Sequence, residues 1–431
     1  MILRLSDSLS RGLLLIGSLI VALWLAFFGV RSGIAGLAAD GESISDLQWA
    51  VRLEPRNPEY WYRLGHYHQF NLEQPDLIAS VESYQKAVTL NPGYTQAWLD
   101  LGTAYETDGN TAAAQDAFLR AKKTYPASAE VAWRYGNFLL RQGTLPEAFA
   151  ELRLALQADP RRAGAVFSRA YRADPDIDAI LSDLLPPLPA VYVDAIAEAV
   201  DSQQLAVAQT MWMRLMKLNP HLQVWQFDKF VGALQAHGDY DAARQVWDQG
   251  ASTMNLPPLI QPRDSVLWDP SFESSLRNTS FAWFFRSLVE GVHTEIDTSD
   301  KLSGKQSLRL TFDGKHNPGA DIACASGVVT PGTKYLFSGW VKTKNLTGDQ
   351  GVRFHLRSRG NGQIPLAATR DIRGTTPWTS IEQDWTAEPG VQEVEVCISR
   401  EPSTNPDIHI SGDAWVDDVT LVPKAVERRR R

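Results

Sequence analysis

Cysteine is scarce in this chain, and no segment interleaves basic with aromatic residues. Only Cys324 and Cys397 occur among 431 residues, so we expect no lipoprotein anchor on an N-terminal cysteine. Lys and Arg total 42 against 50 for Asp and Glu, which gives a formal net charge of -8. Such a chain has no general attraction for phosphate backbones. The sequence therefore predicts no nucleic-acid partner.

The sequence also lacks the short motifs that usually mark catalytic centres. It has no Gly-rich phosphate loop, GxSxG elbow, HExxH or CxxC, and its eight histidines are scattered. A glycosidase would need two carboxylates facing each other across a cleft. We therefore expect a protein that is not an enzyme.

One long apolar run lies near the N-terminus. No charged residue occurs between Arg11 and Arg31, so a helix over about residues 12–30 would span the hydrocarbon layer of roughly 30 Å. Arg4 and Arg11 precede this run, which favours a cytoplasmic N-terminus and an extracytoplasmic or periplasmic bulk. We interpret residues 1–40 as a membrane anchor. A cleaved signal peptide is the alternative, because the small residues of GIAGLAAD suit a peptidase.

The two cysteines leave the redox state open. In an oxidising compartment Cys324 and Cys397 could form a disulfide. Alternation along VQEVEVCISR turns Cys397 away from Val394, Val396 and Ile398, whereas the register around DIACASG stays unclear. Both a disulfide and two free thiols are compatible with this pattern.

The middle of the chain repeats itself with a period of 34 residues. Between Gln96 and Pro126, large apolar and small residues recur at helical spacing on both sides of a turn at Gly109. Small residues such as Gly102 allow two antiparallel helices to approach, and Pro126 ends the second one. The positions that define the pattern are Trp98, Leu101, Gly102, Tyr105, Ala114, Phe118, Ala121 and Pro126.

This pattern resembles the tetratricopeptide repeat. Clear copies occupy about residues 58–92, 95–126 and 129–160, and degenerate hairpins continue to about 254, with 163–189 the least regular part. The resemblance implies an α-solenoid over residues 41–255, whose inner groove, built from the first helix of each repeat, binds a protein partner. The family's carboxylate clamp is not expected, because only Asn137 fits it. The predicted groove residues are Tyr62, His66, Leu99, Thr103, Trp133, Asn137 and Arg141.

After the Pro-rich stretch at 255–264 the pattern changes to short alternating runs separated by turn residues. Around eight such runs predict an antiparallel β-sandwich. They are SFAWFF, SLRLTF, DIACASGVV, KYLFSGWVKT, GVRFHLRS, WTSIEQDWT, VEVCIS and AWVDDVTLV. The fold class is thus multidomain α + β: a transmembrane helix, an α-solenoid and a sandwich.

The segments WDPSFESS, SGKQSLRLTF, VVTPGTKYLFSGWVKT and AWVDDVTLV are similar, in order and spacing, to jelly-roll carbohydrate-binding modules. The resemblance covers residues 264–424 and implies a jelly-roll, galactose-binding-like sandwich. It also implies a structural Ca²⁺ that ties both ends of the domain together through oxygen ligands. Solvated carboxylates without a metal are the alternative. The implied ligand positions are Glu273, Gly304, Lys305 and Asp417.

Alternation also predicts where a glycan would lie. In GVRFHLRS the apolar residues face the core, so the polar residues between them face outwards, together with two glutamates of a neighbouring strand. The predicted glycan-binding residues are Arg353, His355, Arg357, Glu393 and Glu395. Tryptophans of such domains more often lie in the core, but the candidates for an aromatic platform are Trp283, Trp340, Trp378 and Trp385.

These parts together indicate a membrane-anchored, non-catalytic adaptor of a bacterial envelope. The repeat groove would bind a protein and the sandwich a polysaccharide, as in envelope or exopolysaccharide assembly. The alternatives are a protein-only scaffold, whose sandwich binds a protein or acts as a spacer, and an accessory subunit of a polysaccharide-active enzyme. The basic tail at 425–431 is expected to be solvated.

Overall fold

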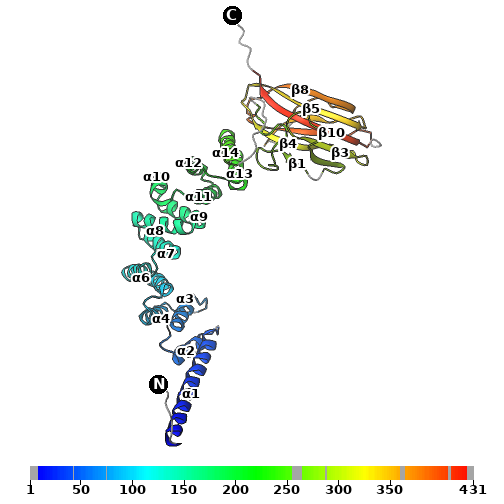
Figure 1. Ribbon diagram of the computed structural model, residues 1–431. Coiled ribbons are helices and arrows are strands. Elements are labelled where there is room, and N and C mark those ends of the chain that lie inside the picture. Colours follow the sequence, from blue (N-terminus) through cyan, green and yellow to red (C-terminus); the bar gives the residue numbers. More distant parts are fainter. Residues whose placement is uncertain are drawn as a thin grey trace, which may run out of the picture. The chain divides into compact units, whose positions relative to one another are not determined.

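The computed structural model describes residues 8–41, 43–73, 75–254, 265–286, 289–359, 365–405 and 409–424 (Figure 1). The chain divides into two compact units, Met1–Val191 and Tyr192–Arg431. The stretch 255–264, the basic tail and Arg4 lie outside the described residues.

The first unit begins with the helix α1 Ser8–Ala39, and the apolar segment Arg11–Ala39 is long enough to cross a membrane. At about 1.5 Å per residue α1 extends beyond the predicted span of 12–30. The extension has a packing reason, because Ala35, Ala38 and Ala39 are buried against α2 Ile44–Leu53. The small residues that suit a signal peptidase therefore belong to a helix–helix contact.

Three helical hairpins follow, where the period predicted them. They are α3 Pro58–Phe70 with α4 Leu77–Leu90, α5 Thr95–Thr107 with α6 Thr111–Thr124, and α7 Ala129–Arg141 with α8 Leu145–Ala158. Gly109 and Gly143 adopt positive φ angles of 79° and 77° at two of the turns. The predicted solenoid fold is confirmed.

A glycine lies at each helix crossing of these hairpins. A Cβ atom at Gly65 would lie 2.8 Å from the Tyr84 ring, and one at Gly136 would lie 2.7 Å from Leu152 Cγ. At Gly102 the nearest atoms belong to the Phe118 ring, at 3.1 Å. The repeated glycine therefore permits the close approach of paired helices.

The pattern becomes irregular next, as the sequence predicts. α9 Ala163–Ala173 is followed by the short α10 Ile177–Ala179 and a π-helical turn, η2 Ile180–Leu184. Regular hairpins then return with α11 Pro189–Asp201, α12 Leu205–Met216, the 3₁₀ turn η3 Val224–Gln226, α13 Asp228–His237 and α14 Tyr240–Thr253.

The C-terminal part is a sandwich of two antiparallel five-stranded sheets (Figure 1). The strand orders are β1-β4-β9-β6-β7 and β2-β3-β10-β5-β8. The strands are β1 Phe284–Phe285, β2 Val292–Asp297, β3 Ser307–Asp313, β4 Ala320–Val328, β5 Lys334–Leu346, β6 Arg353–Ser358, β7 Pro365–Ala368, β8 Gly374–Thr386, β9 Glu393–Arg400 and β10 Ser411–Pro423.

The core of the sandwich consists of alternate residues from both sheets. Phe337, Phe354, Val396 and Val416 are fully buried in it. Eight of these strands coincide with predicted runs, whereas β2 and β7 were missed. Both end a sheet order, β2 has few buried residues and β7 begins with a proline, so neither shows a clear alternation.

Within the second unit, α14 packs on the sandwich. The Trp247 ring is fully buried and lies 5.5 Å from the Trp268 ring, edge to face. Phe281 lies 6.0 Å from Trp247, and Arg244 Nη1 donates to the Val266 carbonyl at 2.7 Å. The last helical hairpin and the sandwich therefore share apolar contacts.

Candidate functional site

The predicted groove residues lie on the first helices of three repeats, but not all of them are accessible. His66 on α3 is exposed, whereas Leu99 on α5 is 1% exposed and belongs to the core between hairpins. Asn137 on α7 is 5% exposed. Leu99 and Asn137 are therefore corrected to structural positions, because the next helix of the array covers them.

A polar network joins α3, α5 and α7. The Tyr62 hydroxyl donates to Asp100 Oδ2 at 2.9 Å, and Arg134 Nη1 pairs with Asp100 Oδ1 at 2.7 Å. Arg134 Nη2 also donates to Thr103 Oγ1 at 2.6 Å. Burial, followed by the nearby Asp100 charge, raises the pKa of Tyr62 above its usual value. Tyr62 and Thr103 thus make contacts between consecutive repeats.

The groove becomes basic towards α9. Arg141 forms a two-pronged pair with Glu106, at 2.6 and 2.7 Å. Arg169 stacks on Trp133, with its Cζ 4.5 Å from the ring centre, and donates to Asn137 Oδ1 at 2.7 Å. Neither Arg169 nor the exposed Arg172 has a carboxylate partner in the described part of the array. This end of the groove therefore carries uncompensated positive charge.

On the sandwich, the five predicted glycan residues share one face. They alternate with buried residues of β6 and β9, and Arg357 lies directly opposite Glu395 in the sheet register. The Nε atoms of Arg353 and Arg357 are buried and lack a hydrogen-bond partner among the described residues. We call the outward side of the β1-β4-β9-β6-β7 sheet the polar face.

Asp321, which the sequence did not single out, organises one end of the polar face. Its carboxylate pairs with Arg357 Nη1 at 2.6 Å and lies 3.6 Å from His355 Nδ1. Ser399 Oγ donates to it at 2.5 Å. Burial alone raises the pKa of Asp321, but hydrogen bonds from His355 and Ser399, with the Arg357 charge, hold it below the usual value. Asp321 therefore stays ionised, and it fixes both His355 and Arg357.

Glu393 organises the other end. Its carboxylate accepts hydrogen bonds from Gln235 Nε2 of α13 at 2.6 Å and from Arg359 Nη1 at 3.0 Å. Burial raises the pKa of Glu393, against the opposing effects of Arg359 and Gln235. Glu395 lies 3.7 Å from Arg359 Nε and is more accessible. The contribution of a helix to this face could not be expected from strand alternation alone.

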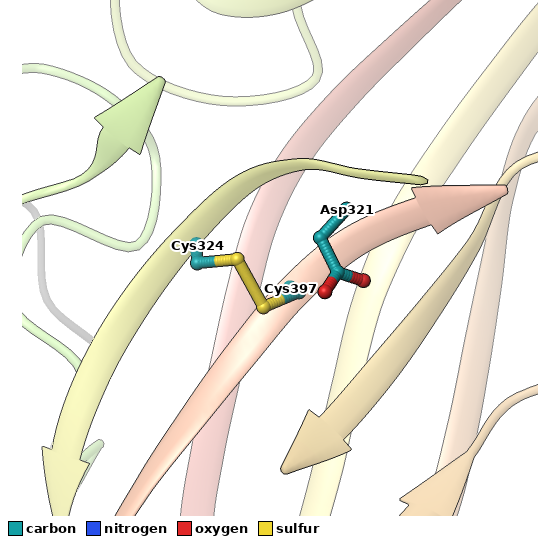
Figure 2. A group of neighbouring side chains, drawn as sticks. All are labelled: Asp321, Cys324 and Cys397. Carbon is teal, nitrogen blue, oxygen red and sulfur yellow. A yellow bond between two sulfur atoms is a disulfide. The ribbon is translucent and has the colours of Figure 1, made fainter. Parts of the chain in front are cut away.

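A disulfide joins Cys324 of β4 to Cys397 of β9, which are directly opposite in the register. Figure 2 shows the bridge beside Asp321. These three residues form the one group of acidic, histidine and cysteine side chains, among those the structure describes, that is close enough to share a metal ion. Because both sulfurs belong to the disulfide, neither is available as a thiolate ligand.

None of the four candidate tryptophans lies on the polar face. Trp283 and Trp385 are buried in the core, while Trp340 and Trp378 belong to β5 and β8 of the other sheet. Phe284 of β1, which is 52% exposed, lies on the polar face. The sequence offered little signal for it, because Phe284 lies in the segment FAWFF, where four of five residues are aromatic.

The predicted calcium positions form a hydrogen-bonded cluster. Glu273 Oε1 accepts a hydrogen bond from the Lys305 amide at 2.6 Å, and a Cβ atom at Gly304 would lie 2.1 Å from the same oxygen. Asp417 Oδ2 accepts from the amides of Leu302 and Ser303 at 2.9 and 3.0 Å. The turn thus presents N–H donors to both carboxylates, whereas Ca²⁺ requires oxygen ligands. These contacts do not fit the ligand set that the resemblance implies, and calcium binding stays a prediction.

Comparison with known proteins identifies the two modules. Residues 72–129 and 99–163 match the family model of the tetratricopeptide repeat, and residues 265–405 match that of a carbohydrate binding domain. The curated relative Protein O-mannosyl-transferase TMTC1 of Mus musculus is 30% identical over 89 residues, which are 20% of this chain and 9% of that protein.

Solved structures resemble either module. A CBM4 structure is 14% identical and covers 33% of this chain and 86% of its own, with a TM-score of 0.25. PilW, a type IV pilus biogenesis factor, is 20% identical over 45% of this chain and 92% of its own, with a TM-score of 0.25. YrrB, a TPR protein with an unusual peptide-binding site, is 13% identical and covers 49% of this chain and 93% of its own, with a TM-score of 0.25.

The chain thus combines tetratricopeptide repeats, a carbohydrate-binding-type sandwich and an N-terminal helix that is apolar enough to span a membrane. Repeats of this kind and carbohydrate-binding domains are non-catalytic modules. The predicted combination of a repeat protein with a sandwich is confirmed.

Proposed function

We propose that this protein is a membrane-anchored, extracytoplasmic adaptor that binds a protein partner through its repeat groove and a glycan through the polar face. The observation that carries the glycan part is the exposed Phe284 ring, which shares the polar face with the accessible side chains of Arg359 and Glu395. A sugar hydroxyl can accept a hydrogen bond from the guanidinium group and donate one to the carboxylate. Bacterial envelope or exopolysaccharide assembly would supply such a ligand.

Two features support the anchor and the compartment. The apolar side chains of α1 from Leu13 to Val30 are exposed, as a lipid-facing helix requires. The Cys324–Cys397 disulfide is typical of an oxidising compartment. We infer that α1 is retained, because cleavage after Ala39 would remove its packing on α2. A reporter fused after Arg431 should be active outside the cytoplasm, and activity of a cytoplasm-only reporter would reject this topology.

The basic end of the groove indicates the chemistry of the protein partner. Burial and the neighbouring charges of Arg141 and Arg172 lower the pKa of Arg169, so these cations repel one another. An acidic segment of a partner would relieve that repulsion and pair with Arg169 and Arg172. Trp133, on which Arg169 stacks, would hold the guanidinium in place.

The partner can be sought by capture from detergent-solubilised membranes. The wild-type chain should retain a protein that Arg169→Gln with Arg172→Gln loses, and added salt should weaken the capture. Arg120→Gln is the matched control, because Arg120 is exposed on α6 and pairs with Asp116. Equal capture by all three chains would place the partner elsewhere.

The glycan can be sought on a polysaccharide array with the full chain in detergent. Glu395→Ala and Phe284→Ala should reduce binding, because the first removes an accessible acceptor and the second removes an exposed aromatic surface. Glu382→Ala, on the exposed side of β8, should have no effect. If no polysaccharide binds, the glycan part of the proposal fails.

A protein-only scaffold is the second candidate. It is favoured by the internal pairs of the polar face, since Arg357 and Glu393 already have partners in Asp321 and Gln235. In that case the chain would bind nothing on the polysaccharide array but would still capture a protein from solubilised membranes. The third candidate, an accessory subunit of a polysaccharide-active enzyme, would require the captured partner to be that enzyme.

A further inference from the structure

Within the second unit, a cavity of about 680 Å³ lies between α13 and the polar face. We call it the α13 cavity. Asp228, Gln235 and Tyr240 line it from the helices, and Ser326, Glu393 and Phe284 line it from the sheet. Its walls come from sequence segments more than 150 residues apart, as the Gln235–Glu393 separation of 158 shows.

α13 is held against the sandwich at both ends. Asp228 Oδ1 accepts a hydrogen bond from the Ser280 amide at 2.9 Å, and Gln235 donates to Glu393 at 2.6 Å. Gln235 is 8% and Glu393 4% exposed, so no extended polymer can pass between them. The polar face is therefore closed where α13 meets β9.

The lining of the α13 cavity suits hydroxyl groups. Asp228, Glu393 and Glu395 offer carboxylate oxygens against the guanidinium groups of Arg286 and Arg359. Three carboxylates against two guanidinium groups leave a slight excess of negative charge, which disfavours binding of a uronic acid. A neutral sugar ring can accept hydrogen bonds from the guanidinium groups and donate hydrogen bonds to the carboxylates through its hydroxyls.

Two further side chains of the α13 cavity, those of Thr279 and Phe284, are available to a ligand. The Thr279 hydroxyl is buried and has no hydrogen-bond partner among the described residues. Phe284 is 52% exposed and offers its ring to the cavity. An aromatic ring can pack on the apolar face of a sugar, and a hydroxyl group can form hydrogen bonds with the hydroxyls at its edge.

We propose that the α13 cavity binds the terminal residue of a neutral glycan chain, so that the protein recognises chain ends rather than chain interiors. This inference rests on the proposed glycan function of the polar face. α13 blocks the path of a continuing glycan chain, because Gln235 and Glu393 close the end of the cavity. Thr279 and Phe284 contact the terminal sugar.

The number of proteins bound per glycan chain distinguishes recognition of chain ends from recognition of chain interiors. The full chain in detergent is titrated calorimetrically with maltohexaose, cellohexaose, xylohexaose and mannohexaose, and with a polymer of the binding linkage of known chain length. We expect one protein per glycan chain whatever the length. Several proteins per long chain, or binding of acidic polymers only, would overturn the chain-end inference and leave the glycan function standing. If neither neutral nor acidic glycans bind, the glycan function fails as well.

Two variants test the residues. Thr279→Val keeps the shape of a side chain whose hydroxyl has no partner, so it should leave the melting temperature unchanged and weaken binding about three- to tenfold. Gln235→Ala opens the wall and should raise the number of proteins bound per long chain above one. Gln245→Ala, exposed on α14, is the control and should behave as wild type. Unchanged affinity in Thr279→Val together with unchanged stoichiometry in Gln235→Ala would contradict the assignment.

Discussion

The repeat array and the sandwich use polar side chains at very different sequence distances. In the array, the pairs Arg134–Asp100, Arg141–Glu106 and Arg169–Asn137 are separated by 34, 35 and 32 residues. In the second unit, Gln235–Glu393, Ser303–Asp418 and Arg309–Asp413 are separated by 158, 115 and 104 residues. The array thus makes contacts about one repeat apart, whereas the second unit connects distant segments.

This difference has a simple physical origin. In a solenoid each repeat contacts only its neighbours, so a shift by one period brings facing residues together. In a jelly roll neighbouring strands are often far apart in sequence. A mutation in the array should therefore act locally, and one at a sandwich contact should affect distant segments.

The largest effect is expected at the contact between the last hairpin and the sandwich. Trp247→Ala removes a fully buried ring between Trp268 and Phe281 and should cost about 3–5 kcal/mol. Circular dichroism should show the helical and the strand signals of the second unit melting at lower temperature together. Trp225→Ala, at a ring that is 72% exposed, is the matched control. A loss of helical signal alone would contradict the shared contact.

Inside the array, Asp100→Ala should cost about 3 kcal/mol, because it leaves the partly buried Arg134 and the Tyr62 hydroxyl without their acceptor. The melt of the sandwich should stay unchanged. Asp116→Ala breaks only the exposed pair with Arg120 and should cost less than about 1 kcal/mol. Equal effects of the two changes would show that Asp100 does not connect the repeats.

Removing the disulfide should destabilise the second unit without affecting the helices of the first unit. Its cysteines are 73 residues apart, and loops of this size lose about 2–4 kcal/mol when opened. Cys324→Ser with Cys397→Ser should therefore lower the melting temperature of the strand signal. A reductant should reproduce the shift in the wild type but not in the double variant. A fall in the melting temperature of the first unit's helices would argue against independent units.

The smallest effect concerns pH. Burial raises the pKa of Asp269 and of Asp417 to about 6. Because the folded state then binds these protons more tightly than the unfolded chain, stability falls as pH rises from about 4 to 6. Lowering the pH from 7 to 4.5 should stabilise the sandwich by on the order of 1 kcal/mol per group.

Calcium would reverse this dependence. A cation held by Glu273 and Asp417 needs ionised carboxylates, so it would stabilise the sandwich at pH 7 and be lost at pH 4.5. Melts at both pH values, with Ca²⁺ and with a chelator, separate the two cases. Asp417→Asn should imitate the acid-stabilised state only if no calcium binds.

Much of the fold was predictable because it is periodic. The glycines at 65, 102 and 136 and the alternation of Phe354 and Leu356 mark helix crossings and a sheet face directly. The groove was harder, because the covering of Leu99 and Asn137 by the next repeat depends on how closely the hairpins stack. Asp321 and Gln235 were not found at all, since their roles arise only when distant segments meet.

The central claim is that one chain binds a glycan and a protein at separate sites. It is tested by immobilising the polysaccharide that binds on the array and passing detergent-solubilised membranes over it with the wild-type chain or a variant. We expect the immobilised polysaccharide to retain the wild-type chain together with its protein partner. It should retain the Arg169→Gln, Arg172→Gln variant without the partner. The Glu395→Ala, Phe284→Ala variant should pass through, still bound to the partner. Retention of the partner by the groove variant, or loss of the partner by the polar-face variant, would contradict the account.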